Sequence, residues 1–248
     1  MTTTATVESS EKKEEDAAVS LSIVVPAYNE EDLVAPTVKH LLETAPRWTD
    51  NMEVIVVNDG SADSTGRIIN ELAAKYENVV GVQQEKNCGF GEAVRTGFKH
   101  ATKTYVMICP ADYRFTLEDF NIYLVLIKYA DIVIGYRRHR RLQLPFYSKL
   151  VSSTYHLFVN LMFNLNFFDI NWIHMYKRSQ MESFIGKSEG VFLLAENIIR
   201  AKRLGLRIVG VDVNYTERES GVPTGVQPKT IMKTIRELLV FFFNRRQD

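Results

Sequence analysis

The stretch SIVVPAYNEE, residues 22–31, joins an apolar run to an abrupt polar end, and this pattern recurs through the first half of the chain. EVIVVND (53–59), VVGVQQ (79–84), TYVMIC (104–109) and DIVIG (131–135) are similar runs, and segments with helical spacing separate them. Strands that are apolar throughout and alternate with amphipathic helices are typical of a parallel sheet covered on both faces. The sequence therefore predicts an α/β fold with a Rossmann-like, mostly parallel central sheet.

Polar residues cluster at four of these strand ends, where a sheet of this kind binds its ligands. The clusters are Tyr28-Asn29-Glu30, Asn58 to Ser61, Asn87 to Gly91, and Ala111-Asp112. Gly89-Phe90-Gly91 alone is a weak signal, because it lacks the GxGxxG spacing and follows the third strand. The sequence contains no GxxxxGK[ST] motif, HExxH motif or Cys/His cluster, which argues against a P-loop enzyme and against zinc chemistry.

The second half of the chain predicts a less regular set of elements. Residues 150–168 contain no Asp, Glu, Lys or Arg, but their Ser, Thr, His and Asn side chains would need partners inside a bilayer. We expect this helix to lie against protein or in an interface rather than to cross a membrane, and a buried core helix is the alternative. A strand over 172–177, a helix over 190–204, a strand over 206–213 and an amphipathic helix over 230–243 follow.

Composition excludes several classes of protein. The 248 residues include 30 Lys plus Arg and 30 Asp plus Glu, and this balance argues against a nucleic-acid binder that works by overall positive charge. Cys88 and Cys109 are too few for a disulfide scaffold and fit a reducing cytoplasm. Residues 1–20 have no apolar signal region and are expected to form a disordered polar tail. A catalytic domain over 21–218 and a loop with an amphipathic helix over 219–248 complete the expected division.

The motifs taken together are more specific than any one of them. SIVVPAYNEE, VVNDGSADST (56–65), NCGFGEAVRTGFKHA (87–101) and an acid after the fourth strand resemble, in this order, the family 2 glycosyltransferases with a GT-A fold. DIVIGYRR (131–138) and DINWIHMYKRS (169–179) look like the polyprenyl-phosphate branch, which includes dolichyl-phosphate mannose synthases. VNYTERESGVPTGVQPKTI (213–231) supports the same assignment.

This resemblance implies a set of donor-binding residues. Gly89 and Gly91 would let the backbone approach the sugar nucleotide, although a simple helix-start turn is the alternative. Asp112 matches the last acid of the family's DxD motif, which positions Mg²⁺ or Mn²⁺ on the diphosphate. Pro110 replaces the first Asp, so weaker metal binding, greater reliance on the diphosphate, or no metal are all compatible with the sequence. The residues expected to hold the nucleotide are Pro26, Tyr28, Glu30 and Asp59, of which Asp59 could instead be a turn former.

The resemblance also implies an acceptor site for an anionic group. Arg137 and Arg218 lie where the polyprenyl-phosphate enzymes carry arginines, whose planar fork matches phosphate oxygens. Lys149 is a third candidate contact, and His174 stands where relatives often show Lys. A solvated basic loop over 137–149 is the alternative interpretation. The expected catalytic set is Asp112, Arg137, Glu196 and Arg218.

The reaction expected from the resemblance is an inverting transfer of a hexose from a GDP-mannose or UDP-glucose type of donor to a polyprenyl phosphate. A phosphate acceptor is already anionic near pH 7 and needs no strong general base. Leu194 replaces the acid of the F-x-D-A-E pattern found in many relatives, which weakly favours such an acceptor. A transferase acting on a hydroxyl of a small molecule or glycan, and a catalytically degenerate sugar-nucleotide binding protein, are the two alternatives.

The zero net charge conceals an uneven distribution. Residues 137–149 and 229–246 are strongly basic, whereas the tail over 1–20 is acidic. The final helix combines apolar and basic residues in a pattern typical of a helix at a membrane surface, so peripheral binding to the cytoplasmic face of a membrane is expected. Docking of this helix on the protein's own core, or on a dimer partner, is the alternative.

Overall fold

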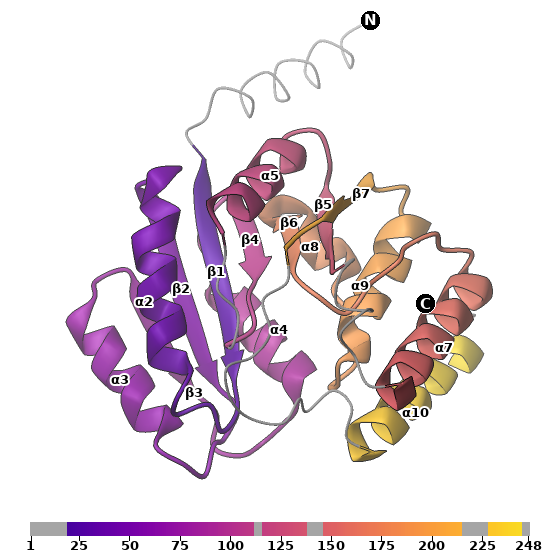
Figure 1. Ribbon diagram of the computed structural model, residues 1–248, viewed down its shortest axis with the longest axis horizontal. Coiled ribbons are helices and arrows are strands. Elements are labelled where there is room, and N and C mark those ends of the chain that lie inside the picture. Colours follow the sequence, from indigo (N-terminus) through magenta and orange to yellow (C-terminus); the bar gives the residue numbers. More distant parts are fainter. Residues whose placement is uncertain (1–18, 112–115, 138–145, 215–227, 245–248) are drawn as a thin grey trace, which may run out of the picture.

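A computed structural model describes residues 19–111, 116–137, 146–214 and 228–244 (Figure 1). Within these residues, seven strands form one sheet in the order β3-β2-β1-β4-β6-β5-β7. β6 runs antiparallel to both of its neighbours, β4 and β5, and the other pairs are parallel. The strands are β1 (Ser20–Ala27), β2 (Asn51–Asn58), β3 (Val79–Gln83), β4 (Tyr105–Ile108), β5 (Ile132–Tyr136), β6 (His174–Lys177) and β7 (Ile208–Asp212).

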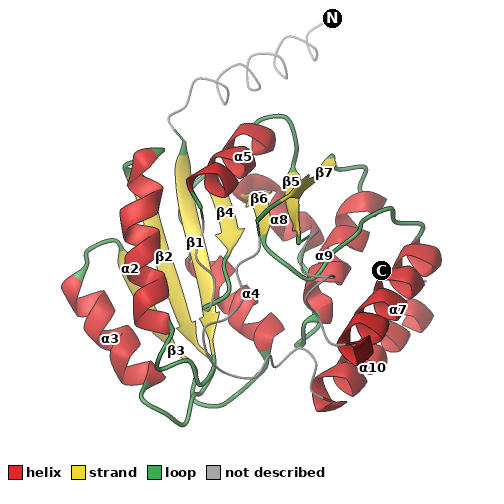
Figure 2. Ribbon diagram, viewed as in Figure 1, coloured by secondary structure: helices red, strands yellow, loops and turns green. Residues whose placement is uncertain are grey.

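Helices cover both faces of this sheet (Figure 2). One core cluster joins α2, α3 and α5 to one face, and a second joins α4, α8 and α9 to the other. α7 and α10 lie side by side at the edge of the second cluster. The helices are α2 (Val34–Thr44), a short 3-10 helix η1 (Ala45–Arg47), α3 (Thr65–Lys75), α4 (Phe90–His100), α5 (Leu117–Ile127), α7 (Phe146–Phe163), α8 (Arg178–Phe184), α9 (Phe192–Arg203) and α10 (Pro228–Asn244).

This architecture confirms the predicted α/β fold with a mostly parallel sheet. The strands expected in the first half lie within a few residues of their predicted positions, because each is a buried apolar run that ends at a polar turn. Thr116 is the N-cap of α5, and its side-chain oxygen accepts a hydrogen bond from the backbone N–H of Asp119. The division into domains at residues 218 and 219 lies outside the described residues and stays a prediction.

The uncharged helix differs from its expected limits. α7 ends at Phe163 rather than at residue 168, since Asn164 adopts a left-handed φ of 51°. Asn160 then fixes the returning chain, because its side-chain amide donates to the Phe167 carbonyl at 2.8 Å. Within the part of the chain that the structure describes, no helix combines the length and the low polarity that a membrane crossing requires.

The C-terminal helix α10 is part of the second core cluster. Leu238 and Phe241 are buried, and the Phe241 ring lies 5.7 Å from the rings of both Phe163 and Phe192. Other apolar side chains of the same helix, among them Phe243, are exposed. α10 therefore docks on the core with one face and leaves a second apolar face uncovered.

Candidate functional site

Asp59 links two loops at the carboxyl edge of the sheet. It follows β2 directly, is almost fully buried, and accepts hydrogen bonds from the backbone N–H groups of Cys88 (2.7 Å) and Gly89 (3.0 Å). Burial raises the pKa of the carboxyl, and these two hydrogen bonds only partly offset it. Asp59 thus fixes the turn that opens α4 relative to the end of β2.

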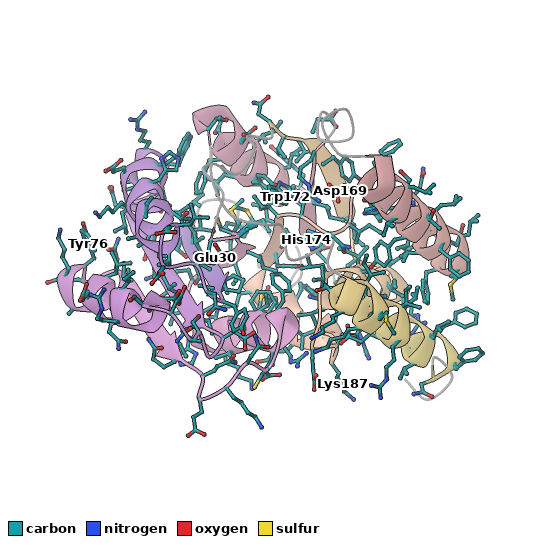
Figure 3. All side chains as sticks on the ribbon, turned by 60° about the horizontal axis from the view of Figure 1, so that its bottom comes forward. Glu30, Tyr76, Asp169, Trp172, His174 and Lys187 are labelled. Atoms are coloured by element: carbon teal, nitrogen blue, oxygen red, sulfur yellow. The ribbon has the colours of Figure 1, made fainter. Side chains whose placement is uncertain are left out.

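The loop after β1 is tied to the loop after β2. The N–H of Glu30 donates to the Thr65 hydroxyl at 2.9 Å, and the N–H of Asn29 donates to the Ser61 hydroxyl at 3.0 Å. Pro26 pairs in register with Val57 across the two parallel strands. Tyr28 is 41% exposed at this edge, so its ring is accessible to a ligand. The structure therefore brings the four residues expected to hold the nucleotide to adjacent strand ends, and Figure 3 shows Glu30 at this edge.

Both glycines of the Gly89-Phe90-Gly91 turn face a neighbouring segment of the protein, the loop 186–190. Gly89 has a φ of 97°, which favours glycine over any L residue. A Cβ atom on Gly91 would lie 2.3 Å from the Ser188 carbonyl oxygen, and the Gly91 N–H donates to the Glu189 carbonyl at 2.6 Å. The space left by these glycines is thus used for packing against this loop; a contact with the sugar nucleotide stays a prediction.

Glu196 holds the loop 186–190 from the α9 side. Its carboxylate accepts from the N–H groups of Lys187 (3.1 Å) and Ser188 (2.9 Å), from the Ser188 hydroxyl (2.6 Å) and from the Arg200 guanidinium (2.9 Å). Burial alone would raise the pKa of this carboxyl, but the hydrogen bonds outweigh burial and lower the pKa. These contacts favour a positioning role for Glu196.

Arg137 is held at the end of β5 by a two-point ion pair. Its Nε and Nη2 atoms lie 2.7 Å and 3.0 Å from the two carboxylate oxygens of Asp169, and Nη2 also donates to the Asn171 carbonyl at 3.1 Å. The guanidinium lies 4.0 Å from the centre of the Trp172 ring. Burial would raise the pKa of Asp169, but the charge of Arg137 holds it well below its usual range. Asp169 is therefore ionised at neutral pH, and the two side chains fix each other.

His156 lies beside this pair, with its Nε2 atom 3.5 Å from the Oδ1 atom of Asp169. Its Nε2 accepts from the N–H of Ile170 at 3.2 Å, and its Nδ1 lies 2.7 Å from the Ser152 carbonyl, so we assign the hydrogen to Nδ1. Asp169 and Trp172 come close together in Figure 3. This geometry favours a positioning role for Asp169, which fixes the Arg137 guanidinium.

His174 lies in the interior rather than at the surface. Its ring has no exposed area, Nδ1 lies 2.7 Å from the Tyr176 hydroxyl and Nε2 lies 2.8 Å from the Ile170 carbonyl. Burial lowers its pKa to about 4, so the ring is neutral at pH 7. These contacts favour a structural role, and its part in binding the acceptor phosphate stays a prediction.

Three of the expected site residues cannot be placed. Asp112 and Arg218 lie outside the described residues, and of Lys149 only the backbone, in the first turn of α7, is described. Among the residues that the structure describes, no group of three or more His, Cys, Asp or Glu side chains could hold a metal ion. The oxygens of Asp59 are engaged by backbone amides, so the described residues do not form a metal site by themselves.

The sequence interpretation missed two residues of α10 that reach this edge of the sheet. Glu237 accepts from the N–H groups of Glu189 (3.2 Å) and Gly190 (2.9 Å), and Lys233 pairs with the Glu189 carboxylate at 3.2 Å. A lone glutamate in a helix that is otherwise basic was the available signal. Its partners lie nearly fifty residues away in the chain, which no local pattern reveals.

The chain is similar in sequence to two transferases of known activity. An undecaprenyl-phosphate mannosyltransferase of Micrococcus luteus is 28% identical over 80% of this chain and 84% of its own. A dolichyl-phosphate beta-glucosyltransferase of Trichomonas vaginalis is 36% identical over 109 residues, which cover 42% of this chain and only 33% of that relative.

Solved structures show the same fold at low identity. The crystal structure of glucosyl-3-phosphoglycerate synthase from Mycobacterium tuberculosis with Mn²⁺, UDP and glucosyl-3-phosphoglycerate has a TM-score of 0.67 and 20% identity. It covers 93% of this chain and 81% of its own. Another structure of that synthase contains Mg²⁺ and UDP. The model of the family described as glycosyl transferase family 2 matches residues 22–184, more than half of the chain, and the chain accordingly belongs to this family of glycosyltransferases.

Proposed function

We propose that this glycosyltransferase moves a hexose from a nucleotide sugar to a polyprenyl phosphate, with inversion at the anomeric carbon. An acceptor phosphate oxygen attacks the anomeric carbon, and the bond from that carbon to the nucleoside diphosphate breaks. The named relatives from Micrococcus luteus and Trichomonas vaginalis support the class of acceptor. GDP-mannose and UDP-glucose are the first donors to test.

The observation that supports a lipid acceptor is an exposed apolar surface on two adjoining helices, α7 and α10. We call this surface the α7–α10 face. On α10 these exposed positions recur every three or four residues, and on α7 they recur at intervals of seven and four residues with Phe158 beside them, so each helix presents one apolar side. The helices touch through Phe163, whose ring lies 5.7 Å from Phe241. The face comprises Leu150, Leu157, Phe158 and Leu161 of α7 and Met232, Ile235, Leu239 and Phe243 of α10.

Such a face fits the surface of a membrane in which a polyprenyl phosphate resides. Exposed basic residues of α10, among them Arg236, lie beside its apolar stripe, which is the arrangement that anionic lipid attracts. Arg245 and Arg246, expected to add to this charge, lie outside the described residues. We place the enzyme at the cytoplasmic face of the membrane as part of this proposal.

On the donor side, Tyr28, Glu30 and Asp59 would bind the nucleotide, with Pro26 shaping the end of β1 and Gly89 and Gly91 shaping the turn. Asp112 would hold Mg²⁺ or Mn²⁺ together with the diphosphate oxygens, and the ion would neutralise charge on the leaving group. Structural neighbours bind these ions with UDP, which supports this part of the proposal.

On the acceptor side, Arg137, Arg218 and Lys149 are the proposed phosphate contacts, and the buried His174 would support this site from the interior. Asp169 engages the Nε and Nη2 atoms of Arg137, so a phosphate would bind this guanidinium by competing with the Asp169 carboxylate. Glu196 supports a phosphate acceptor over a hydroxyl acceptor. A carboxylate with a lowered pKa and four hydrogen-bond contacts is a weak base, and an anionic phosphate oxygen needs none.

The test is transfer of radiolabelled hexose from GDP-mannose and UDP-glucose in the presence and absence of a polyprenyl phosphate. We expect a lipid-extractable product that forms only with the acceptor lipid. Hexose transfer to a soluble acceptor alone would replace the proposal with a hydroxyl transferase. Donor binding without any turnover would replace it with a sugar-nucleotide binding protein.

The α7–α10 face is tested separately by sedimentation with anionic vesicles. Leu161→Glu should reduce the bound fraction, since it places a charge in the apolar stripe. Val125→Glu is the matched control, because Val125 is 47% exposed on α5, which belongs to the other core cluster. Equal binding by the two variants would contradict a membrane role for this face.

A further inference from the structure

Helix α10 places an ammonium group against the glycine turn that opens α4. The Nζ atom of Lys233 lies 3.2 Å from the Oε2 atom of Glu189. A Cβ atom built on Gly89 would lie 3.1 Å from the same Nζ atom, so the ammonium group touches the turn itself. The Lys233 side chain is nevertheless 42% exposed. This cation is therefore held at the turn while part of its surface remains open.

The charge of Lys233 acts on the carboxyls of Asp59 and Glu237, and both of these groups are engaged elsewhere. Asp59 accepts from the N–H groups of the turn, and Glu237 accepts from the N–H groups of Glu189 and Gly190. The charge of Lys233 lowers the pKa of Asp59, although the larger effect of burial raises it. Glu189 pairs with Lys233 through a side chain that is 65% exposed, so this carboxylate has room to move away.

The main chain at Glu189 is fixed independently of this ion pair. Glu189 is anchored by its backbone, since its carbonyl accepts from Gly91 and its N–H donates to Glu237. An ion pair this exposed contributes little to stability, because water screens it. Neither the fold nor the loop therefore requires a lysine at position 233.

We propose that Lys233 binds the diphosphate of the nucleotide-sugar donor, and that the Glu189 carboxylate pairs with the Lys233 ammonium group when no donor is bound. This inference rests on the proposed function, which puts the donor at the glycine turn. Phosphate and carboxylate oxygens are alternative acceptors for one ammonium group. On donor binding, a phosphate oxygen replaces the Glu189 carboxylate, which swings into solvent.

This exchange predicts opposite effects for two substitutions in the same ion pair. Lys233→Met removes the cation and should raise the Kd for a nucleoside diphosphate about tenfold, the effect of one charged hydrogen bond. Glu189→Gln removes the competing carboxylate and leaves the cation, so the Kd should fall or stay unchanged. Lys233→Arg should retain most of the affinity.

The experiment is isothermal titration of the full chain with GDP, UDP and inorganic pyrophosphate, without acceptor. Circular dichroism melting of each variant verifies that it is folded. We expect tighter binding in low salt for the wild type and a weaker dependence on salt for Lys233→Met. A Kd for pyrophosphate that rises in parallel with the Kd for the nucleotide would locate the contact at the phosphates.

Two results would overturn the inference. If the wild type binds GDP or UDP and Lys233→Met binds it equally well, Lys233 has no part in the donor site, while the proposed function stands. If Lys233→Met and Glu189→Gln weaken binding to the same extent, the ion pair acts only by shaping the turn. A wild type that binds none of the three ligands would reject the proposed donor together with this inference.

Discussion

At the scale of single residues, the carboxylates Asp59 and Glu196 both bind backbone amides, yet their pKa values shift in opposite directions. Asp59 receives two backbone N–H groups and is otherwise buried, so the effect of burial dominates. Glu196 also receives the Ser188 hydroxyl and the charged Arg200, and these donors reverse the effect of burial. The number and charge of the donors, rather than burial, decide which carboxylate stays ionised in acid.

The buried ring of His174 predicts a loss of stability in mild acid. Burial lowers its pKa to about 4, whereas an unfolded histidine has a pKa of 6.5. Between these values the unfolded chain binds a proton that the folded chain does not, so the free energy of unfolding should fall as the pH falls from 6.5 to 4. The total loss should be roughly 3 kcal/mol, because one pKa unit is about 1.4 kcal/mol.

Urea denaturation at half-unit pH steps measures this loss. His174→Gln should lower stability at pH 7, since it disturbs two hydrogen bonds, but it should flatten the slope between pH 6.5 and 4. An unchanged slope in this variant would show that other groups carry the acid sensitivity.

At the scale of elements, the first turn of α4 and the loop 186–190 form one packed unit. Helix propensity alone predicts that Gly91→Ala stabilises α4 by about 1 kcal/mol. The new Cβ atom, however, would lie 2.3 Å from the Ser188 carbonyl oxygen, a backbone atom that cannot move without its loop. We expect the clash to dominate, so the melting temperature should fall.

Gly205→Ala is the matched control for this substitution. Gly205 has a φ of 75°, and no atom lies within 4 Å of its Cβ position. Gly205→Ala should therefore lower the free energy of unfolding through backbone strain alone, by about 1–2 kcal/mol. Gly91→Ala should also weaken nucleotide binding if the turn holds the donor, and Gly205→Ala should not. A Gly91→Ala variant that is more stable than the wild type would show that the loop 186–190 can shift at little cost in free energy.

The two faces of α10 predict different responses to truncation of a phenylalanine. Phe241→Ala should destabilise the protein by about 3–5 kcal/mol, because the ring is buried against Phe163 and Phe192. Phe243→Ala should change stability by less than about 0.5 kcal/mol, since this ring is 75% exposed. The effects on vesicle binding should have the opposite order. Among folded proteins, Phe243→Ala should reduce the fraction that sediments with vesicles more than Phe241→Ala does.

At the scale of the whole molecule, the sequence predicts what local patterns encode. The parallel strands and the Asp59 strand end were predictable, because an apolar run followed by a polar turn marks both. The direction of β6 was not predictable, since a strand of four residues, three of them buried, carries no sign of its orientation. α8 was missed because it is a single short helix that follows β6 without a break. Lys233 and Glu237 reach the site through contacts between distant segments.

Removal of divalent metal tests the proposed donor site as a whole. If Asp112 and the diphosphate share an ion, EDTA should abolish sugar transfer, and Mg²⁺ or Mn²⁺ in excess of the chelator should restore it. Because Pro110 replaces one acid of the motif, we expect half-maximal activation to require more metal than in a relative that keeps both acids. Full activity in EDTA would show that cationic side chains alone neutralise the leaving group.

The packing of α10 into the second core cluster also determines when the enzyme can mature during translation. Leu238 and Phe241 fill that cluster, and Glu237 satisfies amides at the loop beside α4. The ribosome releases these residues after every strand of the sheet has already emerged. Until α10 emerges, Phe192 of a nascent chain stays uncovered and the glycine turn of α4 lacks its contacts with α10. Chaperones therefore have the most apolar surface to protect in that interval.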